Sequence, residues 1–406
     1  MRLTSFISFV IAIIGLTQSL HADESSSSSS HQEPHERSFT MELKPRQVLG
    51  SSIPYRVHQV LEKYGVINDG IRYSIKEAAN VGLDSILVDV EYVASIGIGT
   101  PPQYFDLVMD TGSADIWVPS YPCFSCGFHR MFDSRMSSTF TPVNKTWRLG
   151  YFDGSNVLGV VGKDTIKIGN VSHANQVFGL ATSESAAFTK NLLMDGIFGL
   201  SFSSLSLIDR STSLVLNMHA AGDIDEPVIG IYLGRPRDGG KGEVKFGGVN
   251  TRHYTGDFKY IPVTKQQYWQ VDFGGIEIDG RMIGSMVKQA MLDTGTTLTV
   301  LPPELSQAIH AALPGARYSR LYGWLAPCNT SSKSVVTFKL GGQSFPVPIA
   351  DLVRERMSPN NPFLCFSGVT ESTSAGFAII GESFLRSYYT SYDFMNARVG
   401  LAISKA

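Results

Sequence analysis

Two copies of one short acidic motif are the residues of this sequence best suited to catalysis. Asp110-Thr-Gly-Ser follows the apolar run 105–109, and Asp293-Thr-Gly-Thr follows the apolar run 290–292. An apolar run that ends in Thr-Gly predicts a buried strand that delivers a carboxylate at a tight turn. Two carboxylates brought close together cannot both ionise cheaply, so one holds a proton while the other is charged. Such a pair can act as acid and base on one bound water.

A second repeated segment places the two motifs in two halves of similar plan. Each aspartate is followed, at nearly the same distance along the chain, by an apolar pair that ends in glycine: Ile197-Phe-Gly and Ile379-Ile-Gly. One Asp-Thr-Gly arises readily by chance in a chain of this size, whereas two copies in matching frames do not. We therefore predict a pseudo-twofold arrangement with the catalytic site between the halves.

The composition indicates a globular, mostly β protein. The 406 residues are 43% hydrophobic and 17% charged, and the net charge of −2 provides no basic surface for nucleic acid. From about Leu83 to the end, β-branched and aromatic segments alternate with Gly, Asn and Asp turns. The best helical patterns cover 206–217 and 303–313. We predict an all-β chain with minor helices.

The first residues have the pattern of a secretory signal. A positively charged start precedes an apolar core over 6–16, too short for a membrane helix, and we expect 1–22 to be removed. No later run is long enough to anchor the chain in a membrane. Residues 23–37 contain a six-serine run and are predicted to be disordered, and 53–64 could form a helix. We expect secretion, with delivery to an acidic vacuole as the alternative.

Four cysteines fit an oxidising compartment. Cys123 and Cys126 lie three residues apart, and Cys328 and Cys365 stand alone. A zinc site built from Cys123, Cys126 and His129 is the alternative. A second, remote pair favours two disulfides, Cys123–Cys126 and Cys328–Cys365.

Three Asn-X-Ser/Thr sequons would be glycan acceptors in that compartment. They begin at Asn144, Asn170 and Asn329. Sequons also occur by chance, so their occupancy stays open.

From about Leu83 to Lys405 the chain resembles a pepsin-like aspartic protease. The resemblance rests on Ile98-Gly-Thr-Pro-Pro-Gln before the first motif, on Tyr268-Trp-Gln before the second, and on the segments 388–394 and 399–402. The Cys-Phe-Ser-Cys loop is similar to that of fungal, zygomycete-type members. The resemblance implies a bilobal all-β fold with the substrate cleft between two lobes. It divides the chain into a signal peptide 1–22, a propeptide 23–84, an N-terminal lobe 85–262 and a C-terminal lobe 263–406.

The resemblance also implies the chemistry. Asp110 and Asp293 would bind one water; the ionised member would take its proton as the water attacks the scissile carbonyl, without a covalent intermediate, metal or cofactor. Ser113 and Thr296 would hydrogen-bond the outer carboxylate oxygens, and the alternative is that these hydroxyls merely stabilise the turns. Residues implied to support the pair are Thr111, Gly112, Ser113, Thr294, Gly295 and Thr296.

A flap is implied at Tyr151-Phe152-Asp153-Gly154. Tyr151 would close over the substrate and hydrogen-bond Trp117. Phe152 departs from the family, whose members usually carry Gly there, and a bulky side chain at the tip would stiffen the flap or narrow the cleft. Asp153 matches an acidic residue through which some fungal relatives accept Lys, which predicts weak acceptance of Lys beside the scissile bond.

The first substrate pocket is carried over by position, and it would prefer large apolar side chains. Packing in the core is the alternative for each of its members. The implied pocket residues are Val108, Tyr151, Phe188, Met194 and Ile197. Two further substrate-binding residues are implied, Tyr268 and Thr297.

Two more features concern activation and local geometry. Arg72-Tyr73 stands where relatives carry a Lys-Tyr pair whose cation blocks the catalytic carboxylates, and self-cleavage is expected between residues 73 and 84. An Arg is not equivalent to Lys, because its guanidinium is forked and always charged. Glu382 replaces the Asp that commonly follows the second apolar pair and Gly.

The expected activity is that of an acid endopeptidase made as a zymogen. Its expected partners are protein and peptide substrates and pepstatin-type inhibitors, with no nucleic acid and no membrane anchor, and we expect a monomer. Two other enzyme classes do not fit the sequence. A P-type ATPase has a Lys after the Asp of its phosphorylated loop and needs a membrane domain. A glycosidase could use the two carboxylates, but nothing else in the sequence supports one. The main alternative is a catalytically inactive relative that serves as a binding protein or inhibitor.

Overall fold

The computed structural model describes residues 37–46 and 91–405, apart from 152–153, 211–212, 236–239, 321, 359–360 and 374–375. The expected signal peptide, the serine run, the helix over 53–64 and the pair Arg72-Tyr73 lie outside the described residues. Phe152 and Asp153 of the flap lie outside them as well.

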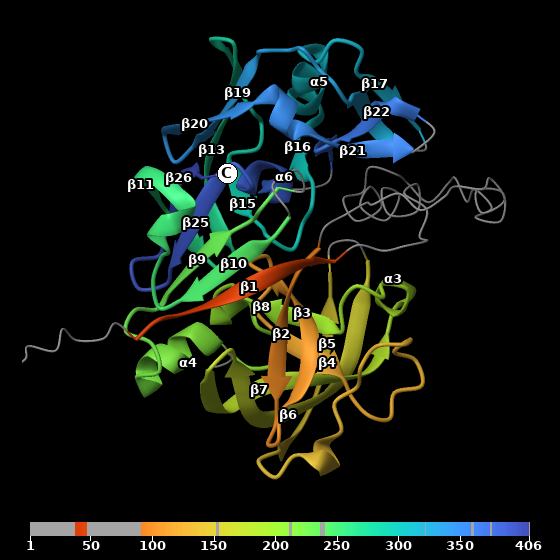
Figure 1. The fold of residues 1–406 in the computed structure, drawn as a ribbon, viewed down its shortest axis with the longest axis vertical. Helices are drawn as coiled ribbons and strands as arrows, with labels where there is room; N and C mark the ends of the chain where they lie inside the picture. The colour runs from red at the N-terminus through yellow and green to blue at the C-terminus, as the bar shows by residue number, and fades with distance from the viewer. Residues whose placement is uncertain are drawn as a thin grey trace, which may run out of the picture. The chain divides into compact units, whose positions relative to one another are not determined.

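Most of the described chain is β-structure, which confirms the predicted fold class. The largest sheet contains segments from both halves of the sequence (Figure 1). In spatial order its strands are β11 (Tyr254–Pro262), β26 (Arg398–Ser404), β25 (Tyr388–Asp393), β9 (Val228–Tyr232), β10 (Gly242–Phe246), β1 (Phe39–Arg46), β2 (Glu91–Ile98), β3 (Gln103–Asp110), β8 (Gly196–Gly199), β4 (Ile116–Pro119), β7 (Val171–Glu184), β6 (Asn156–Ile168) and β5 (Thr141–Gly150).

Two further sheets are formed by the second half of the chain. The larger one runs in the order β20 (Gln343–Pro348), β19 (Val335–Leu340), β13 (Trp269–Ile278), β15 (Gln289–Leu292), β24 (Ala378–Ile380), β16 (Thr299–Leu301) and β23 (Val369–Glu371), with β12 (Lys265–Gln266) and β14 (Arg281–Ile283) paired to β13. The smaller one runs in the order β17 (Arg317–Ser319), β18 (Gly323–Pro327), β22 (Asn361–Ser367) and β21 (Val353–Ser358).

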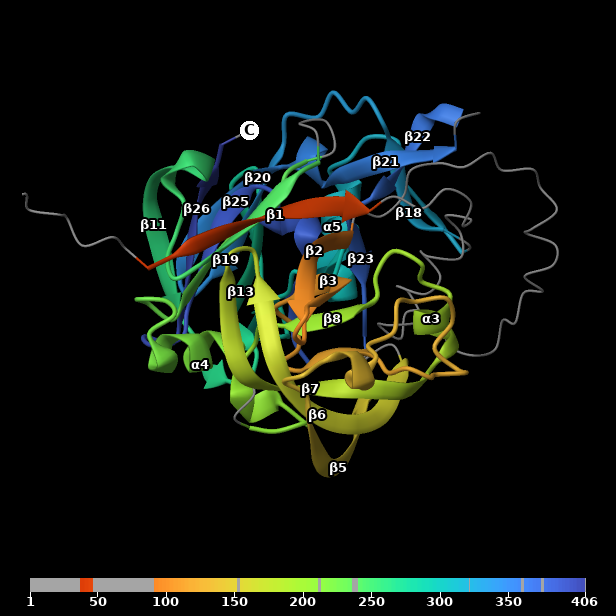
Figure 2. The same cartoon turned by 60° about the horizontal axis from the view of Figure 1, so that its bottom comes forward.

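Strand β1 lies between β10 and β2 in the largest sheet (Figure 1). It pairs antiparallel with β10 along one edge and with β2 along the other. Leu43 of β1 is fully buried, and the ring of Phe39 stacks on Phe246. A segment expected to belong to a propeptide is therefore an integral strand of the largest sheet. The end of the chain joins the same sheet, because β25 pairs with β9 and β26 pairs with β11; β11, β26 and β25 lie side by side in Figure 2.

Helices within the described residues are short. They are α3 (Ala186–Thr189), α4 (Leu214–Ala221), α5 (Pro303–Ala311) and α6 (Glu382–Leu385), with 3-10 turns η1 (Ser134–Met136), η2 (Ser203–Leu205), η4 (Thr251–His253) and η5 (Ile349–Leu352). None of them is long and apolar enough to cross a membrane.

One helix prediction is confirmed and the other needs correction. Helix α5 covers most of the predicted range 303–313, and it starts with proline at its first position. The helix expected over 206–217 begins only at Leu214. The residues before it instead bind the buried Asp115, which accepts hydrogen bonds from the Ser206 hydroxyl and the Leu207 amide. Gly222, with φ of 77°, ends α4.

The core explains why the two central strands are mostly apolar, although the buried Asp106 interrupts the apolar residues of β3. Strand β3 pairs in parallel with β8, and β15 pairs in parallel with β24. Parallel strands in the middle of a sheet are covered on both faces, so both of their faces are apolar. One continuous cluster of buried side chains contains Phe105 and Met109 of β3 together with Leu292 of β15.

Candidate active site

The two aspartates occupy equivalent positions at the ends of central strands. Asp110 is the last residue of β3 and lies opposite Gly199 of β8. Asp293 follows β15 directly, and its amide donates to the Ile380 carbonyl of β24 at 3.0 Å. The second repeated segment of the sequence is thus the strand that pairs with the one delivering the carboxylate. This geometry accounts for the equal spacing of the repeat in the two halves.

Each loop is tied to the other by its threonine. The Thr111 amide donates to the Thr294 hydroxyl at 3.1 Å, and the Thr294 amide donates to the Thr111 hydroxyl at 3.0 Å. The Thr111 hydroxyl donates to the Leu292 carbonyl at 3.0 Å, and that of Thr294 to the Met109 carbonyl at 2.6 Å. Both threonines are buried. The four bonds fix the two acidic loops in a symmetrical arrangement.

The glycines of the two motifs leave room for the carboxylates. A Cβ atom added to Gly112 would lie 2.5 Å from Oδ1 of Asp293, and one added to Gly295 would lie 2.3 Å from Oδ1 of Asp110. Real Cβ atoms do not approach other heavy atoms so closely. Each carboxylate therefore packs against the glycine of the opposite loop, and the two acids belong to one site.

Both carboxylates have the same hydrogen-bond donors. Oδ1 of Asp110 accepts from the Gly112 amide at 2.8 Å, and Oδ2 accepts from the Ser113 hydroxyl at 2.5 Å. Oδ1 of Asp293 accepts from the Gly295 amide at 2.9 Å, and Oδ2 accepts from the Thr296 hydroxyl at 2.6 Å. The two side chains belong to residues that are 7% and 5% exposed. The bonds expected of Ser113 and Thr296 are present.

The flap region is a hairpin between β5 and β6. At its tip the Tyr151 amide donates to the Ser155 carbonyl at 2.9 Å, and the Gly154 amide donates back to the Tyr151 carbonyl at 3.0 Å. Gly154 has φ of 77°, which glycine adopts without strain. The indole Nε1–H of the buried Trp117 donates to the hydroxyl of Tyr151 at 2.8 Å. The tyrosine and the tryptophan are thus joined as the resemblance implied.

The residues carried over to the first pocket gather in one place. Phe188 of α3 packs edge-on against Trp117, with ring centroids 5.2 Å apart, and against Tyr151 at 5.3 Å. The same buried cluster, which includes Trp117 and against which Tyr151 packs, contains Val108, Phe188, Met194 and Ile197. The structure therefore brings these side chains together beneath the flap tyrosine.

Two further candidates lie on the side of the second motif. Burial raises the pKa of the Tyr268 hydroxyl, and the charges of Asp293 and Asp110 raise it further. Tyr268 is therefore within electrostatic reach of both aspartates. Thr297 is half-buried, and its carbonyl accepts from the Ser383 amide at 3.1 Å.

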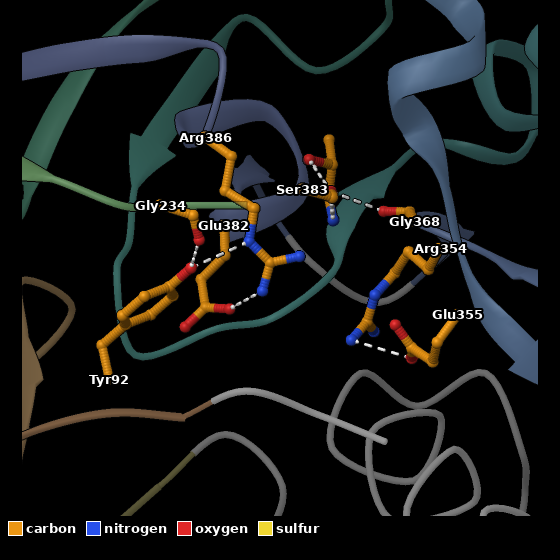
Figure 3. A network of polar contacts seen from close by, with 9 residues as sticks. Tyr92, Gly234, Arg354, Glu355, Gly368, Glu382, Ser383 and Arg386 are labelled. Carbon is orange, nitrogen blue, oxygen red and sulfur yellow. Dashed lines mark hydrogen bonds and ion pairs between the residues drawn. The ribbon is translucent and has the colours of Figure 1, made fainter. Parts of the chain in front are cut away.

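Sequence reasoning missed a buried polar network behind the second motif (Figure 3). Arg386 donates from Nη2 to Glu382 at 3.0 Å and from Nε to the Tyr92 hydroxyl at 3.3 Å, and that hydroxyl donates to the Gly234 carbonyl. Burial raises the pKa of Tyr92 to about 12. The Glu382 amide donates to the Thr296 carbonyl at 2.8 Å. The spacing of Glu382 and Arg386 by four residues was the available signal.

Both predicted disulfides are present, Cys123–Cys126 and Cys328–Cys365. The zinc alternative is excluded, because both of its cysteines are oxidised and His129 pairs with Glu184 at 3.1 Å. Across the part of the chain that the structure describes, no group of three or more His, Cys, Asp or Glu side chains could hold a metal ion. The asparagines of the three sequons are exposed.

Comparison with known proteins gives a consistent picture. Residues 91–404 match the family model described as eukaryotic aspartyl protease. The chain is 38% identical to probable vacuolar protease A of Arthroderma benhamiae over 82% of each chain. It is 32% identical to syncephapepsin of Syncephalastrum racemosum, over 87% of this chain and 88% of that one. It is 35% identical to pepsin-3 of Oryctolagus cuniculus, over 78% and 81%.

Proposed function

The chain belongs to the eukaryotic aspartyl protease family, and on that premise we propose that Asp110 and Asp293 activate water to hydrolyse internal peptide bonds. One observation carries the proposal. Each carboxylate lies against the glycine of the opposite loop and has the same pair of donors, one amide and one hydroxyl. Two acids in matched surroundings can share one proton and one water.

The reaction follows from that shared proton. One carboxylate is ionised and one is protonated, because two negative charges so close together repel strongly. The ionised member takes a proton from water while the water oxygen bonds to the scissile carbonyl carbon, and the protonated member gives its proton to the carbonyl oxygen. The resulting gem-diol collapses when the carboxyl that took the proton from water gives it to the amide nitrogen and the C–N bond breaks. The other carboxylate recovers its proton from a gem-diol hydroxyl, so an acid and an amine leave and the pair is restored.

Specificity is assigned to the apolar cluster beneath the flap. Val108, Phe188, Met194 and Ile197 would accept a large apolar side chain next to the scissile bond, with Tyr151 closing over it. Such a pocket gains free energy from the apolar area it removes from water. Asp153 would allow weak acceptance of Lys.

The enzyme would be made as a zymogen and exported. Residues 23–84 would form the propeptide, and Arg72 and Tyr73 would block the carboxylates before self-cleavage. Relatives named vacuolar protease A and syncephapepsin support either a vacuolar or an extracellular destination. We expect a glycosylated monomer that pepstatin inhibits.

The test is cleavage of an unfolded protein from about pH 2 to pH 7, with and without pepstatin. We expect acid-dependent cleavage that pepstatin abolishes, and a loss on the order of 10³-fold or more in Asp110→Asn and in Asp293→Asn. A processed, folded protein without activity at any pH would instead establish the binding-protein alternative. Activity that survives either substitution would refute the assigned mechanism.

A further inference from the structure

A short loop near the flap exposes two phenylalanine side chains almost completely. Phe124 is 99% exposed and Phe128 is 94% exposed, and both lie in the segment around the Cys123–Cys126 disulfide. Single exposed apolar side chains are normal on a protein surface, whereas two phenylalanines this exposed on one short loop are more apolar surface than such scattered residues account for. This loop therefore needs an explanation beyond packing.

The loop is held rigidly. The disulfide closes it, and Cys126 is fully buried beneath the exposed residues. The Glu184 amide donates to the Ser125 carbonyl at 3.2 Å, which attaches the loop to the end of β7. A rigid loop presents its apolar side chains without a large loss of entropy on binding.

A buried ion pair gives the loop a second attachment. His129 faces Glu184 at 3.1 Å, and both side chains are removed from solvent. The other ring nitrogen of His129 lies 2.9 Å from the carbonyl oxygen of Asn191, just after α3. Burial alone would lower the pKa of His129, but the bond to Glu184 outweighs it, and the pKa is raised. The contacts of His129 with Glu184 and with the Asn191 carbonyl thus fix the loop to the segment after α3.

The loop is continuous with the wall of the proposed apolar pocket. A Cβ atom on Gly127 would lie 2.5 Å from the Thr189 carbonyl oxygen of α3, the helix that carries Phe188. The two loop cysteines belong to the same buried cluster as that phenylalanine. Leu192, which is exposed, follows directly after the residue bonded to His129. The exposed apolar residues thus belong to segments that are attached to α3, whose Phe188 packs against the flap tyrosine.

The charges nearby argue for a polypeptide rather than a membrane as the partner. Arg130 is bound to Asp106 at 2.8 Å and approaches Asp195 at 3.6 Å. Arg135 is bound to Asp133 at 2.7 Å. Loops and helices that insert into anionic membranes place unneutralised Lys and Arg beside their apolar residues. The two arginines that follow this loop are instead paired with carboxylates.

We propose that Phe124, Phe128 and Leu192 form an accessory site for apolar side chains of an unfolded protein substrate, beyond the residues held at the catalytic carboxylates. The site would bind the part of the substrate that runs past the α3 wall. It rests on the proposed function, because its occupant is the substrate of that reaction. It would lower KM for long apolar substrates and leave the chemical step unchanged.

The test compares three substrates that share one cleaved bond. They are a short peptide, the same peptide extended by a leucine-rich segment, and the same peptide extended by a serine-glycine segment. In the wild-type enzyme we expect the apolar extension to lower KM roughly tenfold relative to the polar extension. The Phe124→Ser/Phe128→Ser variant should lose this gain and keep the kcat and KM of the short peptide. Met286→Ser, a change at an 89% exposed residue after β14, is the matched control and should behave as wild type.

The outcomes separate the two proposals. A double variant that keeps the gain from the apolar extension overturns the accessory site while the proposed function stands. A wild-type enzyme that cleaves none of the three peptides removes the proposed function and this inference with it. Equal KM values for the apolar and the polar extension would also overturn the proposal. If the wild-type enzyme then formed a dimer that the double variant did not form, the loop would bind a second copy of the chain. If it bound lipid vesicles and the double variant did not, the loop would bind a lipid surface.

Discussion

Glu382 and Arg386 form a 3.0 Å ion pair that is buried behind the second acidic loop. The glutamate amide is bonded to Thr296, whose hydroxyl binds Asp293. The guanidinium reaches across to Tyr92 on β2, a residue 294 positions away in the sequence (Figure 3). Glu382 is therefore part of a link between β2 and the catalytic loop.

Removing one partner of this pair should be far more damaging than removing both. Arg386→Met leaves the Glu382 carboxylate buried beside Tyr92, and the expected loss is about 3–5 kcal/mol in the free energy of unfolding. Glu382→Leu combined with Arg386→Met removes both charges and should recover most of that loss. Urea unfolding measures the difference. If the double variant were no more stable than Arg386→Met, the unpaired charge of Glu382 would not be the cause of the lost stability.

The packing of the glycines against the opposite carboxylates predicts the effect of a single methyl group. Gly112→Ala and Gly295→Ala each place a carbon within 2.5 Å of an aspartate oxygen, so the carboxylates must separate. We expect peptide cleavage to fall by on the order of 10³-fold, because the pair can no longer share one water. Gly150→Ala is the control, since no atom lies within 4 Å of the added carbon. Normal activity in Gly112→Ala would show that the loops relax.

The bond between Trp117 and Tyr151 should act as a unit. Tyr151→Phe leaves the buried indole N–H without its acceptor, and we expect kcat/KM to fall roughly tenfold, equivalent to about 1.4 kcal/mol. Trp117→Phe should produce a loss at least as large, and the double variant should be little worse than the more damaging single change. Tyr104→Phe, at an exposed tyrosine of β3, should change nothing. Strictly additive losses would mean that the hydroxyl and the indole act independently.

His310 should make the protein less stable as the pH falls. Its ring stacks on Trp324 at 4.0 Å, one ring nitrogen donates to the Ser306 carbonyl at 2.7 Å, and the other accepts from the Ser367 hydroxyl at 2.7 Å. Burial of the ring lowers the pKa of His310 from 6.5 to about 4. The unfolded chain therefore takes up a proton at a higher pH than the folded one, and stability falls as the pH drops from about 6.5 to about 4.

The full loss from this histidine is roughly 3 kcal/mol. His310→Gln removes the titration, so its free energy of unfolding should depend less on pH over that interval. Chemical unfolding at several pH values measures both slopes. Identical slopes in the variant and the wild type would assign the acid sensitivity to other groups.

How much of this could be predicted from the sequence differs between local and distant features. The two acidic loops, the Cys123–Cys126 disulfide and helix α5 depend on short motifs, and these predictions agree with the structure. The Cys328–Cys365 disulfide, which joins residues 37 positions apart, could be predicted only as the pair that remained. The start of α4 could not be predicted, because Ser206 is bound to Asp115, a residue far away in the sequence.

The strand order and the buried network were out of reach for the same reason. Nothing local indicates that β25 pairs with β9, or that Arg386 meets Tyr92. Strand β1 does alternate apolar and polar residues from Phe39 to Lys44, which is a strand signal, but the alternation does not indicate that its partners are β10 and β2. Pairing between distant segments is decided by packing, which a sequence pattern read in short windows does not contain.

Strand β1 has a consequence for the proposed maturation. A cut between residues 73 and 84 would sever the chain but leave residues 39–46 hydrogen-bonded between β10 and β2, with Leu43 in the core. The excised piece would behave as a tightly held subunit, and its departure would open two strand edges at once. Activation would then be completed by a dissociation step, and its rate would be set by the release of β1 from the sheet rather than by bond cleavage. A freshly cut enzyme would migrate as two chains only after denaturation.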